Sequence, residues 1–215
     1  MMTAKFWGCS RQSAWKNTLA GILGMGIALS AWCQSAETVG VDYPATVRVE
    51  GIPLVLNGSG VSYRGMAKQY TLALYAPQKA SRADQVVAGF NSPLQLRFVM
   101  LQSTRLDEMG TTITRGIENN SSREEFFRLI PAIRQMSEVF SRIKRLETGD
   151  TLAIEYLPRV GTLFQVNGQT IGLPISEPSF FPALSRVWLG KKPVTQDLKD
   201  ALLDFRPPPV LEALR

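Results

Sequence analysis

The stretch LNGSGVSYRGMAKQYTLALY, residues 56–75, places polar side chains beside an apolar run. The polar-tipped groups inside the stretch that could do chemistry are the phenols of Tyr63 and Tyr70 and the cations of Arg64 and Lys68. An arginine offers a planar, permanently charged fork that suits a carboxylate, and a tyrosine hydroxyl can add a second hydrogen bond. These residue types favour recognition of an anionic group, whereas Lys68 is expected to be solvated.

The remaining side-chain inventory points away from catalysis. The chain contains no histidine, which is the commonest general base and the commonest metal ligand in proteins. A Ser-His-Asp triad and a histidine-rich zinc site are thereby excluded. Asp107 and Glu108 form a neighbouring carboxylate pair, but adjacent residues project from different sides of a helix. We therefore predict no catalytic residues, no metal site and no cofactor.

Residues 1–36 have the pattern of a secretory signal peptide. Three basic residues precede an uncharged apolar run at residues 18–33, and the small residues Ser35 and Ala36 follow it. The run is shorter than the ~20 residues that a bilayer-spanning helix needs. We expect cleavage after Ser35 or Ala36, no stable membrane span after processing, and a periplasmic or secreted protein.

Cleavage would change the chemistry of the mature chain. It would remove Cys9 and Cys33, and with them every thiol, although lipidation of Cys33 after the bulky Trp32 is a weaker alternative. It would also remove three of the 24 basic residues, which leaves about 21 against 18 acidic ones. Since no basic block remains, we expect no nucleic-acid binding.

Alternating and β-branched segments predict a set of strands. They lie at residues 45–51, 52–60, 68–76, 94–101 and 151–157, followed by a hairpin at 162–172. Asn167 and Gly168 suit the two positive-φ positions of the hairpin's turn. The second of these strands is expected to be short and to run into a glycine-rich turn at residues 57–60.

Helical spacing predicts helices at residues 81–90, 103–120, 121–143, 177–190 and 195–203. The helix at 103–120 should bury Leu106, Met109, Ile113 and Ile117. The helix at 121–143 should begin with a capping box from Ser121 to Glu124, bury an apolar stripe and kink or split at its internal proline. The residues of this stripe are Phe126, Phe127, Ile130, Ile133, Met136 and Phe140, and the proline is Pro131. Trp188 is also expected in the core.

The order of these elements predicts an α+β fold, in which helices pack on one face of a mostly antiparallel sheet. The length after residue 36 suits one domain, which we place at residues 45–204. Three consecutive prolines near the end cannot continue a helix. Residues 205–215 are therefore interpreted as a Pro-rich tail.

Five segments resemble the chalcone isomerase-like family, in particular its exported bacterial branch. They are LNGSGVSYRG, KQYTLALYAP, RGIENN, GDTLAIEYLPRVGTLFQVNG and WLGKKPVTQDLKDALL, which lie between residues 56 and 203. The resemblance implies an open-faced β-sandwich, in which a large antiparallel sheet is covered on one side by helices. It also implies a ligand cleft between the sheet and the helices.

The catalytic residues of the isomerising members are largely unmatched. Those members carry an arginine directly after a Gly-Val pair, where this chain has Ser62, and a threonine on the long strand, where it has Tyr70. Their Tyr-x-x-Lys-x-x-x-Asn array falls on Leu106, Met109 and Ile113. The resemblance therefore does not carry the isomerase chemistry over to this chain.

Non-catalytic members, which bind fatty acids, resemble the chain more. Their carboxylate anchor pairs the arginine after Gly-Val with a tyrosine that Tyr70 matches. Arg64 lies two residues after Ser62, roughly 6.5 Å along a straight strand and on the same face. We therefore predict Tyr70, Arg64 and Ser62 as ligand-binding residues. The alternatives are that Tyr70 is a plain core tyrosine and Arg64 an exposed turn residue.

We interpret the chain as an exported, non-catalytic protein that binds a small amphipathic or carboxylate ligand such as a fatty acid. One alternative is an isomerase or intramolecular lyase that acts on a chalcone-like unsaturated carbonyl compound. Another is a cell-envelope interaction protein without a ligand. The sequence does not identify protein partners.

Overall fold

The computed structural model describes residues 36–88 and 91–204. Nearly all of the predicted signal peptide and the whole Pro-rich tail lie outside these residues, so both stay predictions.

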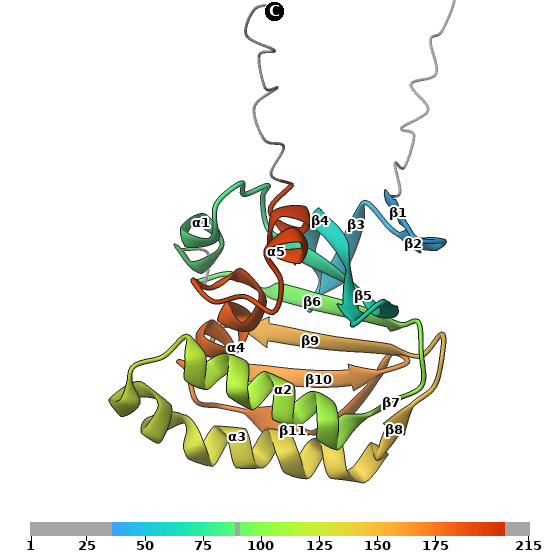
Figure 1. The fold of residues 1–215 in the computed structure, drawn as a ribbon. Coiled ribbons are helices and arrows are strands. Elements are labelled where there is room, and N and C mark those ends of the chain that lie inside the picture. The colour runs from blue at the N-terminus through green and yellow to red at the C-terminus, as the bar shows by residue number, and fades with distance from the viewer. Residues whose placement is uncertain (1–35, 89–90, 205–215) are drawn as a thin grey trace, which may run out of the picture. The chain divides into compact units, whose positions relative to one another are not determined.

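A seven-stranded antiparallel sheet forms the centre of the fold (Figure 1). In spatial order its strands are β11 (Gln169–Ile175), β10 (Gly161–Val166), β9 (Thr151–Leu157), β6 (Leu94–Met100), β5 (Ala67–Ala76), β4 (Ile52–Arg64) and β3 (Thr46–Val49). Two short ladders join β1 (Ala36–Thr38) to β2 (Val41–Tyr43) and β7 (Thr104–Arg105) to β8 (Arg145–Leu146).

Helices lie in front of one face of the sheet (Figure 1). They are α1 (Ala83–Ala88), α2 (Leu106–Asn119), α3 (Arg123–Ile143), α4 (Phe180–Leu189) and α5 (Gln196–Leu202). The predicted α+β fold, with helices packed on one face of a large antiparallel sheet, is confirmed. The predicted hairpin is also confirmed, because Asn167 and Gly168 both have positive φ between β10 and β11.

The core between sheet and helices follows the predicted periodicities. In β6 every second side chain from Leu94 to Met100 belongs to this core, and α2 buries its four predicted apolar residues against it. The prediction for α3 is wrong for Phe127 and Ile130, which are 54% and 45% exposed because they lie on the side turned away from the sheet.

Two further details of α3 differ from the sequence interpretation. Ser122 rather than Ser121 caps the helix, since its hydroxyl accepts a hydrogen bond from the Glu125 N–H at 3.1 Å. Pro131 does not split the helix, which is continuous through it. Pro131 is exposed, so water can reach the Phe127 carbonyl group that the proline leaves unpaired.

The predicted turn at residues 57–60 is wrong, because these residues lie inside the 13-residue strand β4. An irregularity in the pairing with β5 falls between Leu56 and Gly58. There the fully buried Asn57 amide donates to the carbonyl groups of Ala80 at 2.9 Å and Leu202 at 2.7 Å. Its oxygen accepts from the Ala80 N–H at 2.6 Å.

The glycine beside Asn57 permits a close approach of α5 to the strand. A Cβ atom at Gly58 would lie 2.2 Å from the Ala201 carbonyl oxygen, which no side chain could tolerate. The Asn-Gly pattern therefore anchors the last helix on β4, and the sequence offers no local sign that distinguishes this use from a turn.

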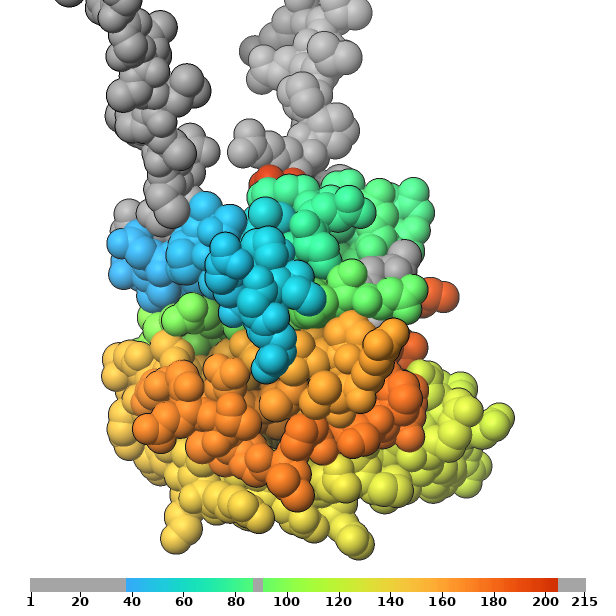
Figure 2. All heavy atoms as spheres, turned by 180° about the vertical axis from the view of Figure 1, so that it is seen from behind, coloured from blue at the N-terminus to red at the C-terminus, as the bar shows by residue number. Residues whose placement is uncertain are grey.

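The N-terminal strands lie on the opposite face of the sheet, where Figure 2 shows them in blue above the orange strands, with a light-blue tip that reaches over these strands. Tyr43 of β2 is buried there in a second apolar cluster with Leu54, Tyr75 and Leu157. Its hydroxyl group lies 2.7 Å from the Thr71 hydroxyl. Burial is the main cause that raises the pKa of Tyr43 to about 12.

A buried carboxyl group also lies on this face. Glu155 of β9 is 7% exposed and accepts hydrogen bonds from the amides of Gln95 at 2.6 Å and Gln165 at 2.9 Å. Burial raises the pKa of Glu155, an effect that the Gln95 bond and Arg97 offset and that Glu50 reinforces. The side-chain oxygen Oε1 of Gln95 is buried without a hydrogen-bond partner in the described part of the chain.

Asn57→Ala should destabilise the fold by roughly 3 kcal/mol or more, because three buried hydrogen bonds lose a partner. Urea unfolding measures this difference, with the exposed Asn91→Ala as the control that should change little. An Asn57→Ala protein as stable as the control would show that the amide does not anchor α5.

Glu155→Gln should stabilise the protein at neutral pH, because the desolvated charge that it removes outweighs the loss of one of the two acceptor oxygens. Because the pKa of Glu155 is raised in the folded state, its contribution to the free energy of unfolding is fully present below the unfolded-state pKa. This contribution is lost as the pH rises through the folded-state pKa. The gain from Glu155→Gln should therefore grow from about pH 4.5 upward. Unfolding free energies across pH test this, and the exposed Glu118→Gln should show no such trend.

Candidate functional site

The three residues predicted to bind a ligand line one pocket. It has a volume of about 180 Å³ and lies where the ends of β4 and β5 meet α2. Its lining comprises Ser62, Tyr63, Arg64, Gln69, Tyr70, Met109, Thr112, Ile113, Trp188 and Val194. The structure thus brings together residues that the sequence linked only through strand spacing and the resemblance.

The pairing of β4 with β5 positions the two hydroxyl groups. Ser62 and Tyr70 are directly opposite each other in the ladder and are 1% and 5% exposed. A straight strand would place Arg64 on the same face as Ser62, but the pairing of β4 with β5 is irregular between Ser62 and Tyr63. Arg64 nevertheless reaches the same pocket from the end of β4, where it is largely exposed.

The Tyr70 hydroxyl is fixed by the helix layer. It accepts a hydrogen bond from the indole N–H of Trp188 at 3.1 Å. Burial is the main cause that raises the pKa of Tyr70, while hydrogen bonds with Ser62 and Trp188 lower it in part. The phenol therefore stays protonated at neutral pH and retains a proton that it can donate.

Arg64 already has an anionic partner. Its guanidinium Nη1 lies 3.0 Å from Oε2 of Glu108 on α2, and the two side chains are 60% and 46% exposed. An exposed ion pair of this kind contributes about 0–1 kcal/mol. A carboxylate that gained further bonds inside the pocket could therefore replace Glu108 on Arg64.

The side of α2 that faces this pocket is mostly apolar. Met109 and Ile113 are buried and line the pocket, and Thr112 adds one hydroxyl. The third position of the predicted array, Leu106, lies instead in a neighbouring groove. The pocket thus combines an apolar wall with hydroxyl groups at its base and an ion pair at its mouth.

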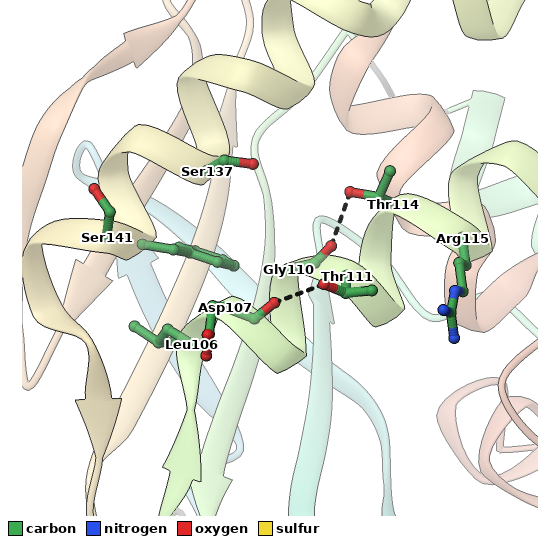
Figure 3. Close-up of a pocket in the computed structure, with 9 residues that line it drawn as sticks. Leu106, Asp107, Gly110, Thr111, Thr114, Arg115, Ser137 and Ser141 are labelled. Atoms are coloured by element: carbon green, nitrogen blue, oxygen red, sulfur yellow. Dashed lines mark hydrogen bonds between the residues drawn. The ribbon is translucent and has the colours of Figure 1, made fainter.

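A larger groove of about 480 Å³ lies between α2 and α3 (Figure 3). Small residues on both helices open it, among them Gly110, Thr111 and Thr114 of α2 and Ser137 and Ser141 of α3. All four hydroxyl groups donate to backbone carbonyl groups of their own helices at 2.8–3.0 Å. The sequence did not predict this groove, because it forms only where α2 and α3 meet. On each helix alone, the small polar residues indicate no more than a solvent-facing side.

Residues 36–88 and 91–204 contain no group of three His, Cys, Asp or Glu side chains that could hold a metal ion. The same part of the chain has no helix that is long and apolar enough to cross a membrane.

A solved structure shares this fold. The crystal structure of a fatty-acid binding protein from Arabidopsis thaliana aligns with a TM-score of 0.62 over 80% of this chain and 96% of that chain. The two sequences are 12% identical, so the likeness concerns the fold. No curated protein matches the chain.

The family comparison covers the whole described domain. A family model described as chalcone isomerase-like matches residues 35–204, which contain all seven strands of the sheet, the five helices and the pocket. The match agrees with the five sequence segments and with the observed arrangement of sheet and helices. The chain therefore belongs to the chalcone isomerase-like family.

Proposed function

We propose that this protein binds a small amphipathic carboxylate, such as a fatty acid, and does not transform it. The observation that carries the proposal is the pocket itself, in which one guanidinium and two buried hydroxyl groups converge beside an apolar wall. Carboxylate recognition by a protein needs this combination of a charge, extra hydrogen bonds and apolar surface.

In the proposed complex the ligand carboxylate replaces Glu108 on Arg64. Tyr70 or Ser62 then donates a hydrogen bond to the same carboxylate. The exposed Glu108 carboxylate receives no such hydrogen bond. The apolar part of the ligand lies against Met109 and Ile113. Binding is favoured because one weak surface ion pair is exchanged for a charge-assisted bond in a partly enclosed site.

Two further observations support a binding role. The Arabidopsis protein that shares the fold is named for fatty-acid binding. In addition, the positions where the family's isomerases hold their polar helical array carry Met109 and Ile113 here, and both line the pocket. An apolar wall suits a hydrocarbon and offers no proton-transfer group.

We also propose that the protein acts outside the cytoplasm, because residues 1–36 have the pattern of a secretory signal peptide. N-terminal sequencing of the exported form should find a start near residue 36. An intact N-terminus would contradict export by cleavage.

Arg64→Gln should weaken the binding of octanoate by roughly ten- to over a hundred-fold, because it removes a charge-assisted hydrogen bond. Glu108→Gln should tighten binding by up to about fivefold, since the ligand no longer competes with an ion pair worth at most ~1 kcal/mol. Tyr70→Phe should weaken binding severalfold. Calorimetric titration of the purified variants measures all three effects.

Arg82→Gln is the matched control, because Arg82 is an exposed arginine paired with Asp84 away from the pocket. It should bind octanoate like the wild type. Equal affinity in Arg64→Gln and Arg82→Gln would contradict the proposed site. Cyclisation of a chalcone clearly above its spontaneous rate would contradict the non-catalytic role.

A further inference from the structure

An aromatic cluster fills the space behind the Tyr70 phenol. The Tyr70 and Phe98 rings meet edge to face at 5.3 Å, and Phe98 meets Trp188 in the same manner at 5.2 Å. Trp188 also donates its indole N–H to the Tyr70 hydroxyl at 3.1 Å, and all three side chains are buried. A hydrocarbon chain that enters beside Ser62 therefore meets the indole instead of free space.

Contacts on α2 hold Trp188 in this place. A Cβ atom at Gly116 of α2 would lie 2.7 Å from Val187, the residue before Trp188, so the two helices are in close contact. The Asn120 side chain then bonds the Lys192 backbone twice, donating to its carbonyl group at 2.8 Å and accepting from its N–H at 2.9 Å. These contacts fix the end of α4, which carries Trp188, against the end of α2.

The remaining space is small. A cavity of about 150 Å³ holds one benzene molecule, whereas pockets for larger ligands have volumes of roughly 300–1,000 Å³. The pocket here has a volume of about 180 Å³, which is room for one ring or a short chain.

We infer that Trp188 is a specificity-determining residue that restricts this site to compact carboxylates, with a chain of about eight carbons or a single ring. The inference rests on the function proposed above and narrows its ligand class. A longer acid can still place its carboxylate at Arg64, but its additional methylenes remain in water and add no affinity.

A chain-length series tests this directly. Calorimetric titration of the purified protein with butanoate, octanoate, dodecanoate and hexadecanoate, each below its micelle concentration, gives the affinity per added methylene. Burial of a methylene strengthens binding by roughly fourfold. Affinity should rise from butanoate to octanoate and then change by less than about threefold up to hexadecanoate.

Trp188→Leu should remove the limit, because the smaller side chain leaves space behind Tyr70. Hexadecanoate should then bind at least about tenfold more tightly than octanoate. Phe181→Leu is the matched control, since Phe181 is a buried aromatic residue of the same helix that does not line the pocket. Thermal melting identifies folded variants, and Trp188→Phe, a smaller change, replaces Trp188→Leu if the latter does not fold.

The outcomes separate this inference from the proposed function. Affinity that keeps rising through hexadecanoate in the wild type would overturn the inference alone. A plateau that is unchanged in the folded Trp188 variant would overturn the role of Trp188. Failure of every acid to bind, or binding unaffected by Arg64→Gln, would overturn the proposed function and the inference with it.

Discussion

The hydrogen bond from Trp188 to Tyr70 joins the helix layer to the sheet at the point where the pocket lies. It fixes the orientation of a phenol that strand pairing has already placed opposite Ser62. Because the indole also packs on Phe98, the same contact fills the interior that the family resemblance suggested as a ligand cleft. What stays open is a small pocket at the edge, with an apolar wall on α2 and Arg64 at its mouth.

Two side-chain amides, the fully buried Asn57 and the half-buried Asn120, hold the ends of helices in place around this contact. Asn57 binds backbone groups of Ala80 and Leu202, and Asn120 binds those of Gly116 and Lys192. Both asparagines belong to the segments that carry the family resemblance. Their side chains bind backbone groups and so hold the fold together. These segments therefore identify the family but not the ligand. Functional differences then depend on side chains that face the pocket, such as Ser62 and Met109.

The strands and helices could be predicted because their signals are local: alternation in β6, for example, and helical spacing in α2. The predictions failed where the decisive contact is distant in sequence. The Asn57 amide bonds the Leu202 carbonyl 145 residues away, and no local rule separates that use from a turn. Exposure of Phe127 depends on how α3 is rotated against the sheet. For the site, the resemblance identified Tyr70 and strand spacing suggested Arg64, but neither could reveal that Glu108 pairs with this arginine or that Trp188 limits the volume.

In the proposed complex a ligand carboxylate exchanges with Glu108 on Arg64, while its chain lies beside Met109 and Ile113. A crystal structure of the protein with bound octanoate tests this most directly. We expect the carboxylate within hydrogen-bond distance of the Arg64 guanidinium and the Tyr70 or Ser62 hydroxyl, with Glu108 released from Arg64. Octanoate in the groove between α2 and α3, with the Arg64–Glu108 pair intact, would contradict it.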